Sequence, residues 1–276
     1  MKRIIATIII LSMFLTTTLA GCSYTVTVAE SSNGNTAIDV KETTKTDTDV
    51  NSTLDDTDLE VPMLESVYKI AKRPEDFAIT DRDYLIVVND DNEYDFDGEY
   101  NKALQKDLVF IPNVIDGDIM AVEKATYLAF TLLQRDLREN DGIEIGLYDG
   151  YRTAEDQQYL LDVYAEGSNP NVTKGNEIGF SEHHTGLLLD VVVWYSEDTW
   201  YSPTDERVKE IPEFKKVYER MVDYGFIQRY PGNKVDITGR DSKEFEIRFV
   251  GSAKIAHEIA DNDLCLEEYL EQKTEQ

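Results

Sequence analysis

Apolar and polar positions along the chain follow patterns that predict several strands. Residues 84–89 (YLIVVN), 107–114 (DLVFIPNV) and 143–150 (IEIGLYDG) are short apolar runs bounded by polar residues or glycine, which is typical of strands. The run 187–194 (LLLDVVVW) predicts a strand that is buried on both faces, and 245–251 (FEIRFVG) predicts one more.

Helical spacing appears between these strands. The segment 121–140 carries apolar residues three and four positions apart, which predicts a long amphipathic helix: Ala125, Leu128, Ala129, Leu132 and Leu133. Thr153, with Asp156 three residues later, predicts the cap of a second helix over AEDQQYLLDVYAE. A third helix at 212–225 opens on proline and closes on glycine, and Ser252 begins a short fourth one.

Helices and strands mixed in this order predict an α+β domain, with a small, mainly antiparallel sheet and helices packed on it. The links between the predicted strands are irregular in length and content. A doubly wound parallel sheet is therefore the less favoured architecture.

The N-terminal region predicts export and a lipid anchor. Residues 1–21 have a positive start and an apolar run that is too short to cross a bilayer, which is typical of a signal peptide. Leu19-Ala20-Gly21-Cys22 resembles a bacterial lipobox, so Cys22 is expected to carry lipid on the outer face of the cell membrane; the alternative is an ordinary signal peptide with an incidental cysteine. Residues 22–61, rich in Ser, Thr and Asp, predict a disordered tether, and 62–276 predict one folded domain.

Charge and cysteine content narrow the possible partners. The 27 basic and 55 acidic residues give a formal net charge of −28, which excludes a nucleic-acid-binding role because phosphate contacts need clustered Lys and Arg. If Cys22 carries lipid, Cys265 is the remaining thiol and no internal disulfide can form; a small packing role is expected for it. We expect a monomer.

One segment, SEHHTGLLLD at 181–190, suggests half of a metal site. His183 lies in a polar loop before Gly186, and Asp190 lies inside an apolar strand, where a carboxylate is costly without a cation or donors. Zinc takes imidazole nitrogen and carboxylate oxygen as ligands. From spacing alone, an Asp190 bonded to backbone amides, with surface histidines, remains an open interpretation.

This segment resembles the SxHxxGxAxD motif of VanY-type D-alanyl-D-alanine carboxypeptidases, zinc peptidases of bacterial walls. Leu188 stands where the family usually has alanine. LYDGYRTAEDQ (147–157) is similar to the family's SGYRSxxxQ, and YGFIQRYPGNKVDITG (224–239) to its GFILRYP and ITG stretch. RFVG and LEEYL resemble its closing segment, so the resemblance covers roughly 80–276 and implies the hedgehog/DD-peptidase-like fold.

The resemblance implies roles for individual residues. His183 and Asp190 would be zinc ligands, and Arg152 would hold the substrate carboxylate or the developing oxyanion. Gln157 and Ser181 would line the peptide pocket. The residue-level alternatives are a surface ion pair for Arg152 and a loop cap for Ser181. His184 falls where the family varies and is expected either to support the site or to be exposed.

The family's second motif, ExWH, is altered here. The aligned stretch KEFE places Lys243 at the position of the family's general base and Glu246 at its third zinc ligand. Glu246 is a plausible ligand, but a protonated lysine cannot accept a proton. Glu244 is the substitute base we predict, since residues 244 and 246 share one face of an extended strand. His257, on a predicted helix, is expected to be a helix-surface residue or a packing residue.

Three functions follow from these observations. The first is a zinc-dependent D-alanyl-D-alanine carboxypeptidase acting on peptidoglycan stem peptides. The second is a catalytically inactive, peptidase-fold lipoprotein that binds stem peptides or a partner protein, as Lys243 and Glu246 suggest. The third is a different hydrolytic specificity on the same fold, because fold alone does not decide the reaction.

Overall fold

The computed structural model describes residues 15–19, 22–30, 36–43, 78, 81–114, 117–166, 177–196, 199–201 and 211–274. The chain divides into two compact units, Met1–Asp58 and Leu59–Gln276. In the first unit, the strands form an antiparallel sheet in the order β1-β2-β3: β1 (Leu15–Leu19), β2 (Cys22–Glu30) and β3 (Thr36–Thr43). These strands lie in the segments that we predict to be signal peptide and tether, and that division of the chain stays a prediction.

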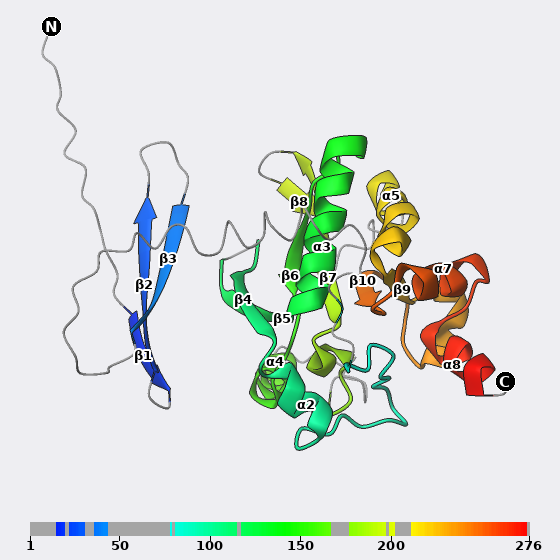
Figure 1. Ribbon diagram of the computed structural model, residues 1–276, viewed down its shortest axis with the longest axis horizontal. Coiled ribbons are helices and arrows are strands. Elements are labelled where there is room, and N and C mark those ends of the chain that lie inside the picture. The colour runs from blue at the N-terminus through cyan, green and yellow to red at the C-terminus, as the bar shows by residue number, and fades with distance from the viewer. Residues whose placement is uncertain are drawn as a thin grey trace, which may run out of the picture. The chain divides into compact units, whose positions relative to one another are not determined.

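The second unit is built on a small antiparallel sheet, as the sequence predicted (Figure 1). Its strand order is β6-β7-β10-β9, with β8 added to β7, and every neighbouring pair is antiparallel. The strands are β6 (Ile145–Asp149), β7 (Leu188–Ser196), β8 (Thr199–Tyr201), β9 (Phe226–Tyr230) and β10 (Lys243–Phe249). The α+β prediction is confirmed.

Helices and one hairpin surround this sheet (Figure 1). The hairpin pairs β4 (Leu108–Pro112) with β5 (Ile119–Glu123). The helices are α2 (Glu99–Leu104), α3 (Lys124–Asp136), α4 (Ala154–Glu166), α5 (Pro212–Met221), α6 (Val235–Thr238), α7 (Ala253–Asp261) and α8 (Leu266–Thr274). Among the described residues, no helix has the length and apolar character needed to cross a membrane.

The predicted helix caps are present. Thr153 Oγ1 accepts a hydrogen bond from the Asp156 amide, and the Asp156 carboxylate accepts one from the Thr153 amide, which closes a reciprocal capping box at the start of α4. Ser252 Oγ accepts from the Ile255 amide and caps α7. Helix α3 begins later than predicted, because residues 121–123 belong to β5 and the Glu123 carboxylate caps the helix through the Thr126 amide.

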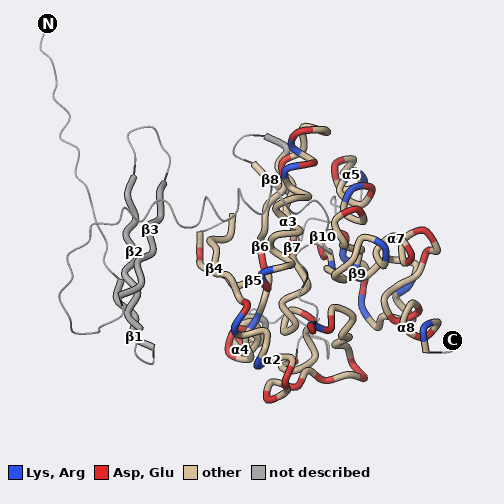
Figure 2. Tube along the Cα trace, viewed as in Figure 1, with Lys and Arg blue, Asp and Glu red and all other residues tan. Residues whose placement is uncertain are grey.

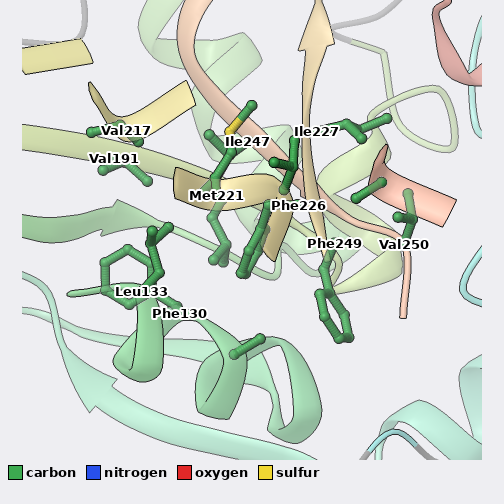
Figure 3. Close-up of a cluster of buried hydrophobic side chains, with 14 of the residues drawn as sticks. Phe130, Leu133, Val191, Val217, Met221, Phe226, Ile227, Ile247, Phe249 and Val250 are labelled. Carbon is green, nitrogen blue, oxygen red and sulfur yellow. The ribbon is translucent and has the colours of Figure 1, made fainter. Parts of the chain in front are cut away.

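The hydrophobic core lies between one face of the sheet and the helices. Figure 3 shows Phe130 and Leu133 of α3 facing side chains of β7, β9, β10 and α5. Alternate residues of β7 point into this core (Leu189, Val191, Val193), as do Ile247 and Phe249 of β10. Since side chains alternate along a strand, Asp190 and Glu246 point to the opposite face.

The predicted strand at 84–89 is wrong. This stretch is not in a ladder; only Asn89 forms an isolated bridge, to Asn92. The buried Arg248 guanidinium donates to the Tyr84 carbonyl at 3.1 Å and to the Ile86 carbonyl at 2.8 Å. A side chain therefore satisfies backbone groups that a partner strand would otherwise pair. The apolar residues of the loop still pack against the core.

Acidic residues are distributed over helices and loops of the second unit rather than gathered in one run (Figure 2). Cys265 is free and fully buried, in agreement with the packing role predicted for it. His257 is partly exposed and lies 2.7 Å from an Asp223 oxygen, so its expected place on a helix surface is confirmed.

Candidate active site

Three carboxylates lie in a row across three neighbouring strands. Asp190 of β7 is the direct register partner of Asp149 on β6 and of Glu246 on β10. The side chain of Glu246 is almost completely buried and that of Asp190 nearly so. Buried carboxylates so close together require cations or hydrogen-bond donors, and the surrounding residues supply both.

His183 approaches this row from a short 3-10 helix, Glu182–Thr185. Gly186 ends that helix in the left-handed region at φ 70°, and a Cβ there would lie 3.1 Å from Leu104 and 3.2 Å from Glu123, which explains the glycine. His183 Nδ1 donates to the Gly150 carbonyl at 2.7 Å. The opposite ring nitrogen, Nε2, is thereby left as an acceptor and lies 3.5 Å from Asp190 Oδ1.

The structure brings His183, Asp190 and Glu246 together, as the sequence predicted for the three metal-binding positions. One ligand atom from each residue lies within 4.8 Å of the others, and all three residues are buried. His183 Nε2, Asp190 Oδ1 and Glu246 Oε2 each lack a hydrogen-bond partner. Buried polar atoms left in this way are costly, and a divalent cation would satisfy all three at once. The donor set therefore fits a metal ion such as zinc.

Arg152 lies beside this cluster and connects its elements. Its Nε donates to Asp149 at 2.8 Å, its Nη2 is 3.8 Å from Asp190 Oδ2, and its backbone amide donates to the His183 carbonyl at 3.2 Å. Burial lowers the pKa of Arg152, but the Asp149 and Asp190 carboxylates outweigh that effect and raise it. The guanidinium thus stays charged and neutralises Asp149, a carboxylate that would otherwise repel an anionic substrate.

Lys243 makes an ion pair with one of the three cluster residues. Its Nζ lies 2.6 Å from Glu246 Oε1. Burial would lower the pKa of Lys243, but the carboxylates of Glu246 and Asp190 raise it, so the ammonium form is maintained. Burial raises the pKa of Glu246, and Lys243 opposes that rise. Lys243 therefore cannot serve as a proton acceptor.

Glu244, the base predicted from the sequence, is not brought into this cluster. Its carboxylate accepts a hydrogen bond from Ser242 Oγ at 2.7 Å, and its carbonyl accepts one from the Tyr218 hydroxyl. The physical reason is an irregular register between Lys243 and Ile247, which lets the side chains of Lys243 and Glu246 meet. A regular strand would have placed residues 244 and 246 on one face.

The remaining residues predicted for the site are all buried. Gln157 lies fully buried in the first turn of α4, and Ser181 precedes the helix that carries His183. His184 is buried rather than exposed: its Nδ1 donates to the Arg152 carbonyl at 2.8 Å, and its Nε2 accepts from the Gly179 amide at 3.2 Å. Burial lowers the pKa of His184 to about 4, so the ring is neutral and helps to hold the Arg152 backbone.

Sequence reasoning missed a buried ion-pair network behind the cluster. The Glu182 carboxylate accepts from Arg229 Nε at 2.6 Å and from Arg248 Nε, and all three side chains are fully buried. Glu182 precedes His183, while Arg248 is two residues from Glu246, so the network joins the two elements that carry these ligands. The RFVG and QRYP motifs contain both arginines, but nothing in their spacing indicates a shared partner.

A groove of about 390 Å³ adjoins the site between the β4–β5 hairpin and α4. Arg152 and Asp149 line one end of it. Phe110, Ile119 and Tyr159 line it as well and are unusually exposed, at 71%, 51% and 69% of their surface. Large apolar side chains exposed together in this way are typical of a binding surface.

Comparison with known proteins decides the family. Residues 120–252 match the family model described as VanY, D-alanyl-D-alanine carboxypeptidase. The resemblance to the VanY-type family seen in the sequence motifs is therefore confirmed. The chain is 36% identical over 140 residues to a putative carboxypeptidase, YodJ, of Bacillus subtilis, covering 49% of each chain. It is 32% identical over 146 residues to a D-alanyl-D-alanine carboxypeptidase of Enterococcus faecalis, covering 49% of this chain and 50% of the relative. The chain thus spans about half the length of these curated relatives.

Solved structures agree with this assignment. A vancomycin resistance D,D-pentapeptidase VanY in complex with Zn(II) is 27% identical, with a TM-score of 0.51, and covers 68% of this chain and 98% of its own. The LD-carboxypeptidase LdcB is 28% identical, with a TM-score of 0.56, and covers 72% and 87%. These neighbours confirm the peptidase fold predicted from the motifs.

Proposed function

We propose that this protein is a zinc-dependent carboxypeptidase that removes the terminal D-alanine from peptidoglycan stem peptides. The observation that carries the proposal is the convergence of three unsatisfied ligand atoms, from His183, Asp190 and Glu246, beside the Arg152 guanidinium. The relatives named as D-alanyl-D-alanine carboxypeptidases support the substrate class.

Each residue has a distinct task in this proposal. A bound zinc ion would act as a Lewis acid and make water more acidic. His183, Asp190 and Glu246 would hold that ion, with the His183 ring fixed by the Gly150 carbonyl. Arg152, neutralised in part by Asp149, would bind the substrate's terminal carboxylate, and Gln157 and Ser181 would shape the pocket around it.

Proton transfer requires a base, and both residues at or next to the position of the family's base, Lys243 and Glu244, are engaged by other groups. Lys243 stays an ammonium, and Glu244 is engaged by Ser242. Glu244 remains the candidate base, but its side chain would have to leave Ser242 to reach a water at the cluster. A slow enzyme is therefore expected relative to one with a carboxylate already in place.

A second candidate function is binding without catalysis. The observation that favours it is the Lys243–Glu246 ion pair, at 2.6 Å, in the stretch where the family's base and third ligand are expected. In this case the Arg152 end of the groove would bind stem peptides, and no bond would be cleaved.

Release of D-alanine from a stem pentapeptide separates the two functions. The enzyme hypothesis predicts zinc-dependent release by the full chain, lost in Asp190→Ala and strongly reduced in Arg152→Ala. The binding hypothesis predicts no release, but retention on purified peptidoglycan that Arg152→Ala weakens. A Lys243→Glu, Glu246→His double variant serves as a control, since a gain of activity there would assign the defect to these two positions.

We also propose that Cys22 carries lipid and anchors the protein to the outer face of a bacterial cell membrane, beside its proposed substrate. The side chain of Cys22 lies outside the described residues, so support comes from the lipobox resemblance. Cys22→Ser is expected to move the protein from the membrane fraction to the soluble fraction. Unchanged membrane association, or absence of lipid on Cys22 by mass spectrometry, would contradict the anchor.

A further inference from the structure

Lys243 is the second cation beside the cluster, and the reaction proposed above gives it no task. Three contacts fix its position. Its backbone pairs with Tyr230 of β9, its Nζ lies 5.9 Å from the centre of the Tyr230 ring, and the same Nζ lies 2.6 Å from Glu246 Oε1. The lysine side chain is 40% exposed, whereas that of Glu246 is 3% exposed. The ammonium thus caps the Glu246 carboxylate from the solvent side.

This contact makes the two carboxylate oxygens of Glu246 inequivalent. Oε1 is occupied by the ammonium, while the buried Oε2 has no partner and belongs with His183 Nε2 and Asp190 Oδ1. A carboxylate with both oxygens free can chelate a cation through the pair of them. In Glu246 the ammonium competes with a cation for Oε1, so the unpartnered Oε2 is the favoured donor.

We propose that Lys243 is a positioning residue that restricts Glu246 to one donor oxygen and so keeps a coordination position open for water or substrate. The inference rests on the proposed metal site. Catalytic zinc sites have three protein ligands and an open fourth position, whereas a fourth protein oxygen would close the site. Lys243, at the position of the family's base, would thus prevent Glu246, at the position of the third ligand, from binding the ion through both oxygens.

The charge of Lys243 distinguishes the proposed role from a purely structural one, because the two roles predict different metal affinities when the ammonium is removed. The cluster and its neighbours contain three carboxylates, Asp149, Asp190 and Glu246, and two cations, Arg152 and Lys243. Removing the ammonium makes the site more negative, so a divalent ion should bind at least as tightly. The open position, however, should be lost to the second Glu246 oxygen.

The test uses the full chain loaded with Co²⁺, whose visible spectrum reports the number of ligands. Wild type, Lys243→Met and Lys243→Arg are compared, with Lys254→Met as a control on an exposed lysine of α7. Each is titrated with acetohydroxamate, a small ligand for an open metal position. Lys243→Met should bind one Co²⁺ with undiminished affinity, show an altered spectrum and bind acetohydroxamate at least about tenfold more weakly. Lys243→Arg should restore the wild-type behaviour, and Lys254→Met should not change it.

Two results would overturn the inference while leaving the metal site intact. One is a Lys243→Met spectrum and acetohydroxamate affinity equal to those of wild type. The other is a clear loss of Co²⁺ affinity in Lys243→Met, which would assign Lys243 to assembling the site instead. If wild type binds no Co²⁺, the proposed metal site itself fails, and the inference fails with it.

Discussion

At the scale of single residues, the site contains carboxylates that repel one another and cations that offset this repulsion. Asp149, Asp190 and Glu246 are neighbours across the sheet. Arg152 pairs with the first two, and Lys243 pairs with Glu246. Burial raises the pKa of Asp190, but His183 and Arg152 outweigh burial and lower it. Each of the three carboxylates thus has a basic side chain beside it, which offsets part of their mutual repulsion.

Glu182 is the residue on which the support of this site depends most. Its buried carboxylate lies between two fully buried guanidinium groups, so Glu182→Gln would leave Arg229 and Arg248 without full compensation. Loss of one partner from a buried ion pair costs about 3–5 kcal/mol. We expect the free energy of unfolding, measured by urea denaturation, to fall by about that amount.

An exposed ion pair gives the matched control for this substitution. Glu219 pairs with Lys216 at 2.5 Å on the surface of α5, and exposed pairs contribute little. Glu219→Gln should leave the unfolding midpoint nearly unchanged. Equal effects of the two substitutions would mean that the buried network does not stabilise the fold.

Some residues of the site could be predicted from the sequence, whereas one of its contacts could not. The resemblance to the family's motifs implied His183, Asp190, Glu246 and Arg152, and the structure brings all four together. It did not predict the Lys243–Glu246 contact, because residues three apart point to opposite faces of a regular strand. A local register irregularity creates that contact, and no residue pattern in KEFE signals it.

At the scale of elements, an ion pair fastens the C-terminal helix to the sheet. Arg229 of β9 donates to both oxygens of Glu267 of α8, at 3.0 and 2.6 Å. Burial would raise the pKa of Glu267, but the guanidinium outweighs it, so the pKa lies below its usual value. The contribution of this pair is therefore complete above the unfolded pKa and is lost as pH falls through the folded pKa.

The lowered pKa of Glu267 predicts that its contribution to stability depends on pH. At pH 7, Glu267→Gln should be less stable than wild type by about 2 kcal/mol, as expected for hydrogen bonds to a charged group. The difference should shrink as pH falls below about 4.5, where wild type also becomes protonated. Urea denaturation of both proteins between pH 7 and 3 measures it. A difference that does not change with pH would show that the carboxylate charge is not what fastens α8.

The groove between the β4–β5 hairpin and α4 gives a prediction for substrate binding. Tyr159 lines the groove and is 69% exposed, whereas Tyr148 on β6 is exposed outside it. If the upstream part of the peptide lies in the groove, Tyr159→Ala should raise KM for a stem pentapeptide several-fold, with little change for the D-alanyl-D-alanine dipeptide. Binding to the purified peptides provides the same comparison without turnover.

Tyr148→Ala is the control for that comparison. It removes an aromatic side chain of the same kind from a position that does not line the groove, and it should change neither KM. Equal effects of Tyr159→Ala on the long and the short substrate would remove the groove from the binding path.

Helices and strands were predicted well where a local sequence pattern determines them. They were predicted poorly where long-range contacts determine the backbone conformation. Capping residues and apolar periodicity located α4, α5 and α7, and the apolar run located β7. The apolar run at 84–89 predicted a strand, but Arg248, more than 160 residues away, binds its carbonyl groups instead. Local patterns contain no information about such a distant partner.

At the scale of the whole molecule, charge and motif order are the informative features. The net charge of −28 argues against nucleic acid as a partner, but it does not indicate a fold. The fold followed from the order of several short motifs along the chain. The family match over residues 120–252 and the structural neighbours confirm that inference.

Zinc stoichiometry of the full chain tests the proposed site most directly. We predict one tightly bound zinc ion per chain, lost in Asp190→Ala and in Glu246→Gln, with both variants folded by circular dichroism. Zinc absent from a folded wild-type chain would contradict the proposal, since His183, Asp190 and Glu246 would then not act as ligands. Zinc retained in both variants would place the ion elsewhere and contradict it equally.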